Sequence, residues 1–314
     1  MRPVPAAILT LTLGLVACTR ALEQHPESGP PTMYRPKPSI AVWEVPRQTL
    51  SPASIPQIAT ELPTFMQIVT PRPTSTTTDC LRQGGSKIET SLSTSLLPHP
   101  MEYLVYLPPC YYYRSTQRYP ALYLIHGQSY SHDQWDRLGV DDIADALIAA
   151  GEIPPFIIVM PRDRQWTQPE EDKFGQVVAD LLVPTIDLRF RTLPDRVHRA
   201  IGGLSRGAGW AVHLGLSRWD LFGAIGAHSL PVFQSDAPQI ARWLDATPRA
   251  SLPRIYIDIG EHDRPSILAS TRWFENLLNE KNIPHEWHLF TGYHEEAYWQ
   301  AHLEQYLRWY TQEW

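Results

Sequence analysis

One stretch of the sequence decides the fold: Arg199-Ala200-Ile201-Gly202-Gly203-Leu204-Ser205-Arg206-Gly207-Ala208-Gly209. Its apolar first half predicts a buried strand, and a Gly-x-Ser-x-Gly turn then leads into the start of a helix. Gly203 and Gly207 lack a Cβ atom, so strand and helix can approach closely while Ser205 takes a strained backbone conformation. The pattern predicts that the Ser205 hydroxyl stands above the edge of a sheet, at the positive end of the next helix, as a nucleophile.

Short apolar runs alternate with longer helical runs on both sides of this stretch. The expected strands are 102–107, 121–125, 156–160, 199–203, 224–227, 254–259 and 286–290. The expected helices are 141–150, 174–183, 207–216, 239–246, 271–281 and 295–310. Near-continuous apolar strands separated by helices predict an α/β fold, with a mostly parallel central sheet and helices on both faces. In such sheets the functional residues gather in the loops beyond the carboxyl ends of the strands.

Composition narrows the class of protein further. The 27 basic and 33 acidic side chains give a net charge of −6, which argues against nucleic acid as a partner because phosphate binding needs clustered Lys and Arg. Hydrophobic residues make up 43% of the chain, enough for a packed core. Only three cysteines are present, so a disulfide scaffold is excluded.

The first residues have the pattern of an export signal. Arg2 precedes an uncharged apolar stretch, 6–17, which is too short to span a bilayer as a helix. This stretch ends in Leu15-Val16-Ala17-Cys18, which resembles the lipobox of bacterial lipoproteins. We expect residues 1–18 to be a signal peptide, with a lipid on Cys18 that anchors the protein to the cell membrane. An ordinary secretory signal with an incidental cysteine stays open, and in either case the mature chain is extracytoplasmic.

Two further segments follow. Residues 19–78 are rich in proline, serine and threonine and show no sustained apolar periodicity, which predicts a disordered tether. Residues 79–314 are long enough for one large domain with a single core.

A serine nucleophile needs a base to take its proton and a carboxylate to orient that base. His294 lies in a loop just past the last expected strand, where the third member of the order Ser, acid, His is expected. For the acid there are two candidates, Asp258 inside a strand and Asp263 beyond its end. Asp263 is preferred because it can reach the imidazole from the same edge of the sheet, and Asp258 is then expected to accept hydrogen bonds from loop amides.

Acyl transfer also needs donors aimed at the developing oxyanion. Two backbone N–H groups are placed for this role, that of Arg206 directly after the serine and that of Gln128 in His126-Gly127-Gln128, after the strand 121–125.

At this point the motifs carry a family resemblance. They are Tyr119-Pro120-Ala121-Leu122-Tyr123-Leu124-Ile125-His126-Gly127 with Trp135, Pro155-Phe156-Ile157-Ile158-Val159-Met160-Pro161, Gly203-Leu204-Ser205-Arg206-Gly207, Gly260-Glu261-His262-Asp263, and Gly292-Tyr293-His294 with Trp299. In this order they resemble the Putative esterase family of the α/β-hydrolase superfamily, which includes S-formylglutathione hydrolases, feruloyl and siderophore esterases, and mycolyltransferases. The resemblance implies an α/β-hydrolase fold, a triad of Ser205, Asp263 and His294, and an acyl-serine intermediate. Two residues depart from the family pattern, since many members carry Met at Arg206 and a second glycine is common at Tyr293.

The remaining cysteines, Cys80 and Cys110, flank the first strands of the domain, and in an exported chain we expect them to form a disulfide. Two buried thiols are the alternative, because sequence does not supply their separation.

Substrate recognition is less well defined by the sequence. Four side chains fall in loops after strands and are candidates to line a cleft: Asp133, Trp135, Trp166 and Ser229. Packing in the core is the other interpretation of each Trp. The sequence does not identify the ester.

The leading functional hypothesis is an extracytoplasmic serine esterase that uses no cofactor and no metal. The alternatives are an acyltransferase to a sugar or lipid hydroxyl with the same triad, and a surface binding module that has lost catalysis. A metal hydrolase built from His262, His285 and His288 is disfavoured because a His-x-x-His spacing in a strand points its side chains to opposite faces.

Overall fold

The computed structural model describes residues 77–314. The predicted signal peptide, the lipid site at Cys18 and all but the last two residues of the predicted tether lie outside the described residues. The first helix, α1 (Thr77–Arg82), begins just before the predicted start of the domain at 79. Within the described part of the chain, no helix combines the length and apolar character needed to cross a membrane.

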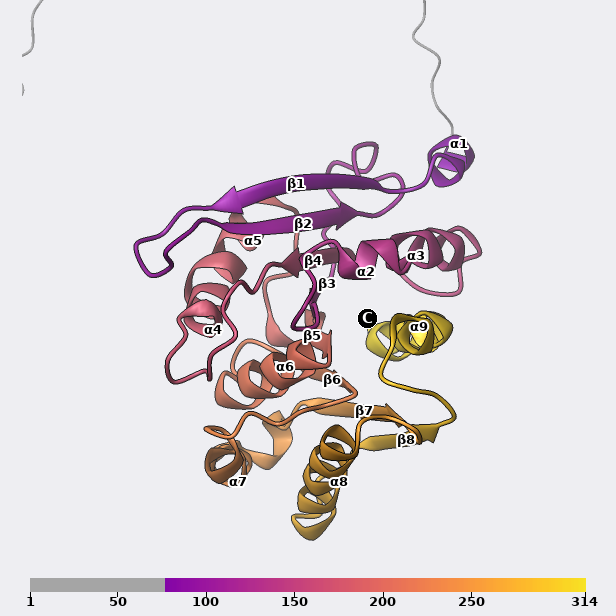
Figure 1. The fold of residues 1–314 in the computed structure, drawn as a ribbon. Coiled ribbons are helices and arrows are strands. Elements are labelled where there is room, and N and C mark those ends of the chain that lie inside the picture. Colours follow the sequence, from indigo (N-terminus) through magenta and orange to yellow (C-terminus); the bar gives the residue numbers. More distant parts are fainter. Residues whose placement is uncertain (1–76) are drawn as a thin grey trace, which may run out of the picture. The chain divides into compact units, whose positions relative to one another are not determined.

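A single sheet forms the centre of the domain, and its strands run in the order β1-β2-β4-β3-β5-β6-β7-β8 (Figure 1). The pairs β1 with β2 and β2 with β4 are antiparallel, and every other pair is parallel. The strands are β1 (Ser86–Leu92), β2 (Met101–Leu107), β3 (Ala121–Ile125), β4 (Ile157–Pro161), β5 (Arg199–Leu204), β6 (Ala224–His228), β7 (Arg254–Gly260) and β8 (Glu286–Phe290).

Helices cover both faces of the sheet (Figure 1). They are α2 (Gln134–Arg137), α3 (Val140–Ala149), α4 (Phe174–Val177), α5 (Val183–Arg189), α6 (Arg206–Ser217), α7 (Ala237–Ala246), α8 (Pro265–Glu280) and α9 (Glu296–Thr311). The prediction of a mostly parallel sheet with helices on both faces is confirmed.

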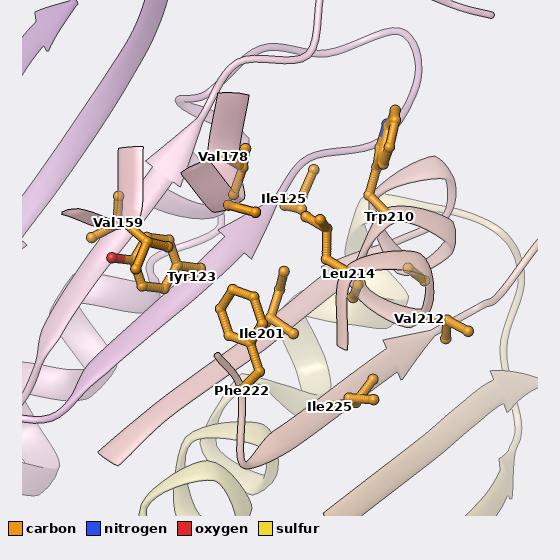
Figure 2. Close-up of a cluster of buried hydrophobic side chains, with 14 of the residues drawn as sticks. Tyr123, Ile125, Val159, Val178, Ile201, Trp210, Val212, Leu214, Phe222 and Ile225 are labelled. Atoms are coloured by element: carbon orange, nitrogen blue, oxygen red, sulfur yellow. The ribbon is translucent and has the colours of Figure 1, made fainter. Parts of the chain in front are cut away.

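The alternation of side chains along β3 shows how the two faces are filled. Tyr123 and Ile125 belong to the core beneath α4 to α8, which Figure 2 shows with Val159, Ile201 and Trp210 around them. Leu122 and Leu124 point to the opposite face and pack with residues of α3 and α9. Because all five residues of β3 are buried, the strand has a continuous apolar sequence.

Several elements differ from the prediction. Strand β1 was not expected, because at this edge of the sheet its residues alternate between half-buried and exposed, and only Ile88 and Leu92 pack on the core. The single helix expected at 174–183 is α4 followed by a π-helical turn, Val178–Leu182, and α5. Helix α8 begins earlier than expected, at Pro265, since proline is well suited to a first helical turn.

A disulfide joins Cys80 in α1 to Cys110 in the turn after β2, with their Cα atoms 5.0 Å apart. The bond therefore ties the first described helix to the antiparallel end of the sheet.

Candidate active site

The turn between β5 and α6 holds Ser205 at a positive φ, with φ 53° and ψ −125°, which is rare for a residue other than glycine. The glycines around it are required by close contacts. A Cβ atom on Gly203 would lie 2.2 Å from the backbone carbon of Gly207, and one on Gly207 would lie 2.1 Å from the carbonyl oxygen of Ile125. The predicted strand, sharp turn and helix are therefore present, and larger residues at these glycines would push α6 away from the sheet.

Three side chains from three loops meet at this turn. The Nε2 atom of His294 lies 2.9 Å from the Oγ atom of Ser205, and its Nδ1 atom lies 2.9 and 3.0 Å from the carboxylate oxygens of Asp263. The Asp263 side chain is fully buried and that of His294 is 8% exposed. A proton on Nδ1 is thus held by Asp263, and Nε2 is left to accept the hydroxyl proton of Ser205.

Asp263 receives a second hydrogen bond from the backbone N–H of Arg264, at 2.6 Å. Trp299 packs edge-on against the His294 ring, with 5.0 Å between ring centroids, and its Nε1 atom donates to the hydroxyl of Ser229 at 3.3 Å. The imidazole is therefore fixed by a carboxylate on one side and an indole on another.

The residues that carry the two predicted oxyanion donors lie beside the serine, Arg206 next to it in the chain and Gln128 along the same cavity. Arg206 is the first residue of α6, so its backbone N–H has no acceptor inside the helix. The loop that carries Gln128 passes directly over the nucleophile, since a Cβ atom on Gly127 would lie 3.7 Å from the Cβ atom of Ser205.

A cavity of about 250 Å³ opens at Ser205. It is lined by Gly127, Gln128, Ser129, Tyr130, Leu204, Ser205, Arg264, His294, Glu295 and Trp299. The predicted nucleophile, base and Gln128 all border the same space, which is where an ester would have to bind.

The structure contradicts two of the four predicted substrate-binding residues, Trp135 and Ser229. Trp135 is 1% exposed and donates from Nε1 to the carbonyl of Ile125, so it is part of the core. Ser229 is fully buried beneath Trp299. Asp133 accepts from Ser131 and pairs with Arg137, and Trp166 is largely exposed, and neither lines the cavity. A position after a strand places a residue at the correct edge without deciding where its side chain points.

Sequence reasoning missed Tyr130, Arg264 and Glu295 among the lining residues. A signal for the last two was available, because Arg264 directly follows the acid and Glu295 directly follows the base. A residue next to a catalytic side chain in a loop is carried to the same edge of the sheet.

Asp258 is the centre of a separate polar cluster beneath the site. Its carboxylate contacts Nδ1 of His228 at 2.5 Å and accepts from the hydroxyls of Tyr298 at 2.6 Å and Tyr306 at 2.7 Å. Burial, with the charge of Asp258 nearby, raises the pKa of both tyrosines, so they remain donors. The expected bonds from loop amides are replaced by side-chain donors, two of which come from α9.

The histidines of the disfavoured metal hypothesis do not converge. His285 precedes β8 and contacts the carbonyl of Ile283, His288 stacks on Phe290, and His262 packs on Tyr293. In the described part of the chain, no group of three or more His, Cys, Asp or Glu side chains is arranged to hold a metal ion.

The elbow serine after β5, the acid after β7 and the base after β8 define an α/β-hydrolase. The model of a family described as Putative esterase matches residues 93–310, and the chain belongs to this family. Fold and family together make the domain a serine carboxylic-ester hydrolase.

Curated relatives share parts of the chain. An endo-1,4-beta-xylanase/feruloyl esterase of Xylanibacter ruminicola is 38% identical over 118 residues, which are 35% of this chain and 16% of the relative. Esterase Rv1288 of Mycobacterium tuberculosis is 27% identical over 241 residues, with 60% of this chain and 51% of the relative covered. The chain thus spans from about a sixth to about half of the length of these relatives.

Solved structures resemble the domain over nearly their whole length. A ferulic acid esterase has a TM-score of 0.65 and 25% identity, with 74% of this chain and 99% of that chain covered. The S-formylglutathione hydrolase of Staphylococcus aureus has a TM-score of 0.57 and 18% identity, with 73% and 98% covered, and shows the fold alone.

Proposed function

We propose that this protein hydrolyses a carboxylic ester through an acyl-Ser205 intermediate. The observation that carries the proposal is the hydrogen-bond chain from the Ser205 hydroxyl through His294 to a buried Asp263. The complete chain also argues against a binding module that has lost catalysis.

The proposed chemistry uses these three side chains and the two backbone donors. Ser205 Oγ attacks the ester carbonyl carbon while Nε2 of His294 takes the hydroxyl proton, and the negative charge on the carbonyl oxygen is stabilised by the N–H groups of Gln128 and Arg206. The intermediate collapses, the alcohol leaves with the proton from His294, and an acyl-serine remains. Water then attacks the acyl-serine with His294 as base, which releases the acid and restores the Ser205 hydroxyl.

For the acyl group we propose a hydroxycinnamate such as ferulate. The support is the 38% identity to the xylanase/feruloyl esterase and the structural likeness to a ferulic acid esterase at 25% identity. Tyr130 lines the cavity beside Ser205 and is 44% exposed, so it offers aromatic surface to such a ring.

A panel of esters tests both parts of this proposal. It compares methyl ferulate, methyl sinapate and p-nitrophenyl acetate, each with and without a sugar acceptor, for wild type and Ser205→Ala. A higher kcat/KM for the hydroxycinnamates supports the acyl group, and loss of turnover in Ser205→Ala supports the mechanism. If acylated sugar is the main product, the protein is an acyltransferase and the proposal of hydrolysis is wrong. The same assays are repeated with a chelator, and loss of activity there would support the metal alternative.

We further propose that the protein is extracytoplasmic and anchored by a lipid on Cys18. The support is the sequence Leu15-Val16-Ala17-Cys18 together with the Cys80–Cys110 disulfide, since such bonds persist in oxidising compartments. Mass spectrometry of the membrane-extracted protein should show a mature chain that begins at an acylated Cys18. A chain that begins elsewhere and carries no acyl mass would rule out the lipid.

A further inference from the structure

The ring of His126 is buried directly below the loop that carries Gln128. It is 2% exposed; its Nδ1 atom lies 2.7 Å from the carbonyl oxygen of Gly127, and its Nε2 atom accepts the backbone N–H of Asp163 at 2.9 Å. Burial lowers the pKa of His126 and favours the neutral ring. Since Nε2 is an acceptor, the single proton of a neutral ring is on Nδ1 and is donated to Gly127.

This bond sets the direction of an oxyanion donor. The carbonyl of Gly127 and the N–H of Gln128 belong to one planar trans peptide group, so they point in opposite directions. Because the His126 ring is buried, a Gly127 carbonyl held against it turns the N–H of Gln128 away from the ring, and Gln128 itself lines the cavity. Two other hydrogen bonds act on the same loop. The N–H of Tyr130 donates to the same Gly127 carbonyl at 3.2 Å, and the N–H of Gly127 donates to the Gln134 side chain at 2.8 Å.

The other donor residue is held by the same neighbour. The Arg206 side chain is 8% exposed, and its Nε atom donates to the Asp163 carboxylate at 2.6 Å while Nη2 donates to the carbonyl of Thr167 at 2.9 Å. The same carboxylate oxygen accepts from Nε1 of Trp210 at 2.8 Å, and Asp172 lies 3.7 Å from Arg206. Asp163 therefore holds His126 through its backbone and Arg206 through its side chain.

We propose that His126, Asp163 and the Arg206 side chain form a buried bracket that presets both amide donors of the oxyanion hole. His126 and Asp163 are then positioning residues for the reaction, because they act on the substrate only through Gln128 and Arg206. The proposal rests on the proposed ester hydrolysis. The bracket gives a role to the guanidinium group of Arg206, of which only the backbone N–H takes part in the reaction. It also gives a role to His126 and Asp163, which are buried and do not border the cavity.

The test compares His126→Ala, His126→Asn and Asp163→Asn with wild type. An alkyl boronic acid, which forms a charged tetrahedral adduct on the serine, measures the oxyanion hole without turnover. For His126→Ala we expect kcat to fall about 10- to 100-fold, which is less than the loss of a whole donor, with KM changed less than about twofold. The dissociation constant of the boronic acid should rise by a similar factor.

His126→Asn should recover most of the lost kcat, because its amide N–H₂ can donate to the same carbonyl of Gly127. Asp163→Asn keeps the backbone N–H to His126 but removes the charge opposite Arg206, and we expect about a tenfold fall in kcat with weaker boronic acid binding. His285→Ala is the matched control. It loses a histidine-to-carbonyl contact of 2.8 Å just before the start of β8, whereas the site lies beyond the carboxyl ends of the strands, so both measurements should stay unchanged.

Unchanged boronic acid binding in folded His126→Ala would overturn the bracket, as would an Asn variant no better than Ala. If His126→Ala does not fold, Asp163→Asn decides alone, and wild-type boronic acid binding in that variant overturns the proposal. Failure of the proposed function looks different. The wild type would then turn over no ester, while boronic acid binding to Ser205 would still report on the bracket.

Discussion

The Nε2 atom of His294 lies 2.9 Å from Oγ of Ser205, although 89 residues separate them in the chain. The distance is short because β5, β6, β7 and β8 are parallel neighbours whose carboxyl ends reach the same edge of the sheet. Ser205 follows β5, Asp263 follows β7 and His294 follows β8. Each loop need carry its side chain only a short way to complete the triad.

Replacement of Ser205 by Ala should lower kcat for p-nitrophenyl acetate by about 10⁴-fold or more, because the nucleophile is lost while the oxyanion donors remain. The far-ultraviolet circular dichroism spectrum and the unfolding midpoint should stay close to wild type. Ser217→Ala, at the other end of α6, is the control and should keep full activity. A Ser205→Ala variant as active as wild type would contradict the assignment of the nucleophile.

Asp263→Asn should reduce kcat by about 10³- to 10⁴-fold with little change in KM, because the amide no longer holds the proton on Nδ1 of His294. Steady-state kinetics against pH measures this effect. The opposite result, a near-normal kcat in Asp263→Asn and a large fall in kcat in folded Asp258→Asn, would show that Asp258 is the acid that orients His294.

Asp258→Ala should instead reduce stability. The change leaves His228 and the hydroxyls of Tyr298 and Tyr306 buried without their shared acceptor. We expect the free energy of unfolding in urea to fall by about 3–5 kcal/mol. A variant as stable as wild type would show that these groups find other partners.

Removal of the disulfide by the double change Cys80→Ser and Cys110→Ser should lower the free energy of unfolding by about 3–4 kcal/mol, since the bond closes a loop of 30 residues. The bridge lies away from the residues that line the cavity, so kcat should not change. Denaturant titration and ester turnover measure the two effects separately. A large fall in kcat in the folded double variant would contradict this expectation and would show that the disulfide affects the active site.

Burial raises the pKa of the Asp145 carboxyl, against the hydrogen bonds from Tyr106 and Gly85 that favour its charged form. The folded protein therefore holds this proton more tightly than the unfolded chain does. This contribution to stability is present below the unfolded pKa and is lost as the pH rises through the folded pKa.

The consequence is a pH-dependent difference between wild type and Asp145→Asn, which does not titrate at this position. As the pH rises from about 4 to 7, the urea midpoint of wild type should fall relative to that of the variant. A relative gain by wild type over the same range would mean that the folded pKa is depressed.

Particular residues show how far sequence could lead. The glycines around Ser205 allow the turn to be predicted from the sequence, because larger residues at these positions would clash with the backbone. Asp263 and His294 could be selected because a position past a strand end is enough to place a residue at the shared edge. Trp135 could not be assigned correctly, because its direction depends on a hydrogen bond to the carbonyl of Ile125 in another segment. Strand β1 was missed because it is an outer strand with no fully buried residue, so its sequence lacks a continuous apolar run.

Sequence by itself determined the main alternation of strands and helices from β2 onward, the turn at Ser205 and the loops that carry the acid and the base. These depend on local steric limits and on apolar periodicity, which are properties of short segments. Only the tertiary structure decided that Arg206 pairs with Asp163, that His126 holds the peptide of Gln128, and that Arg264 and Glu295 line the cavity. The reason is physical: such contacts join segments far apart in the chain, and each side chain takes its direction from partners that exist only once the core has packed.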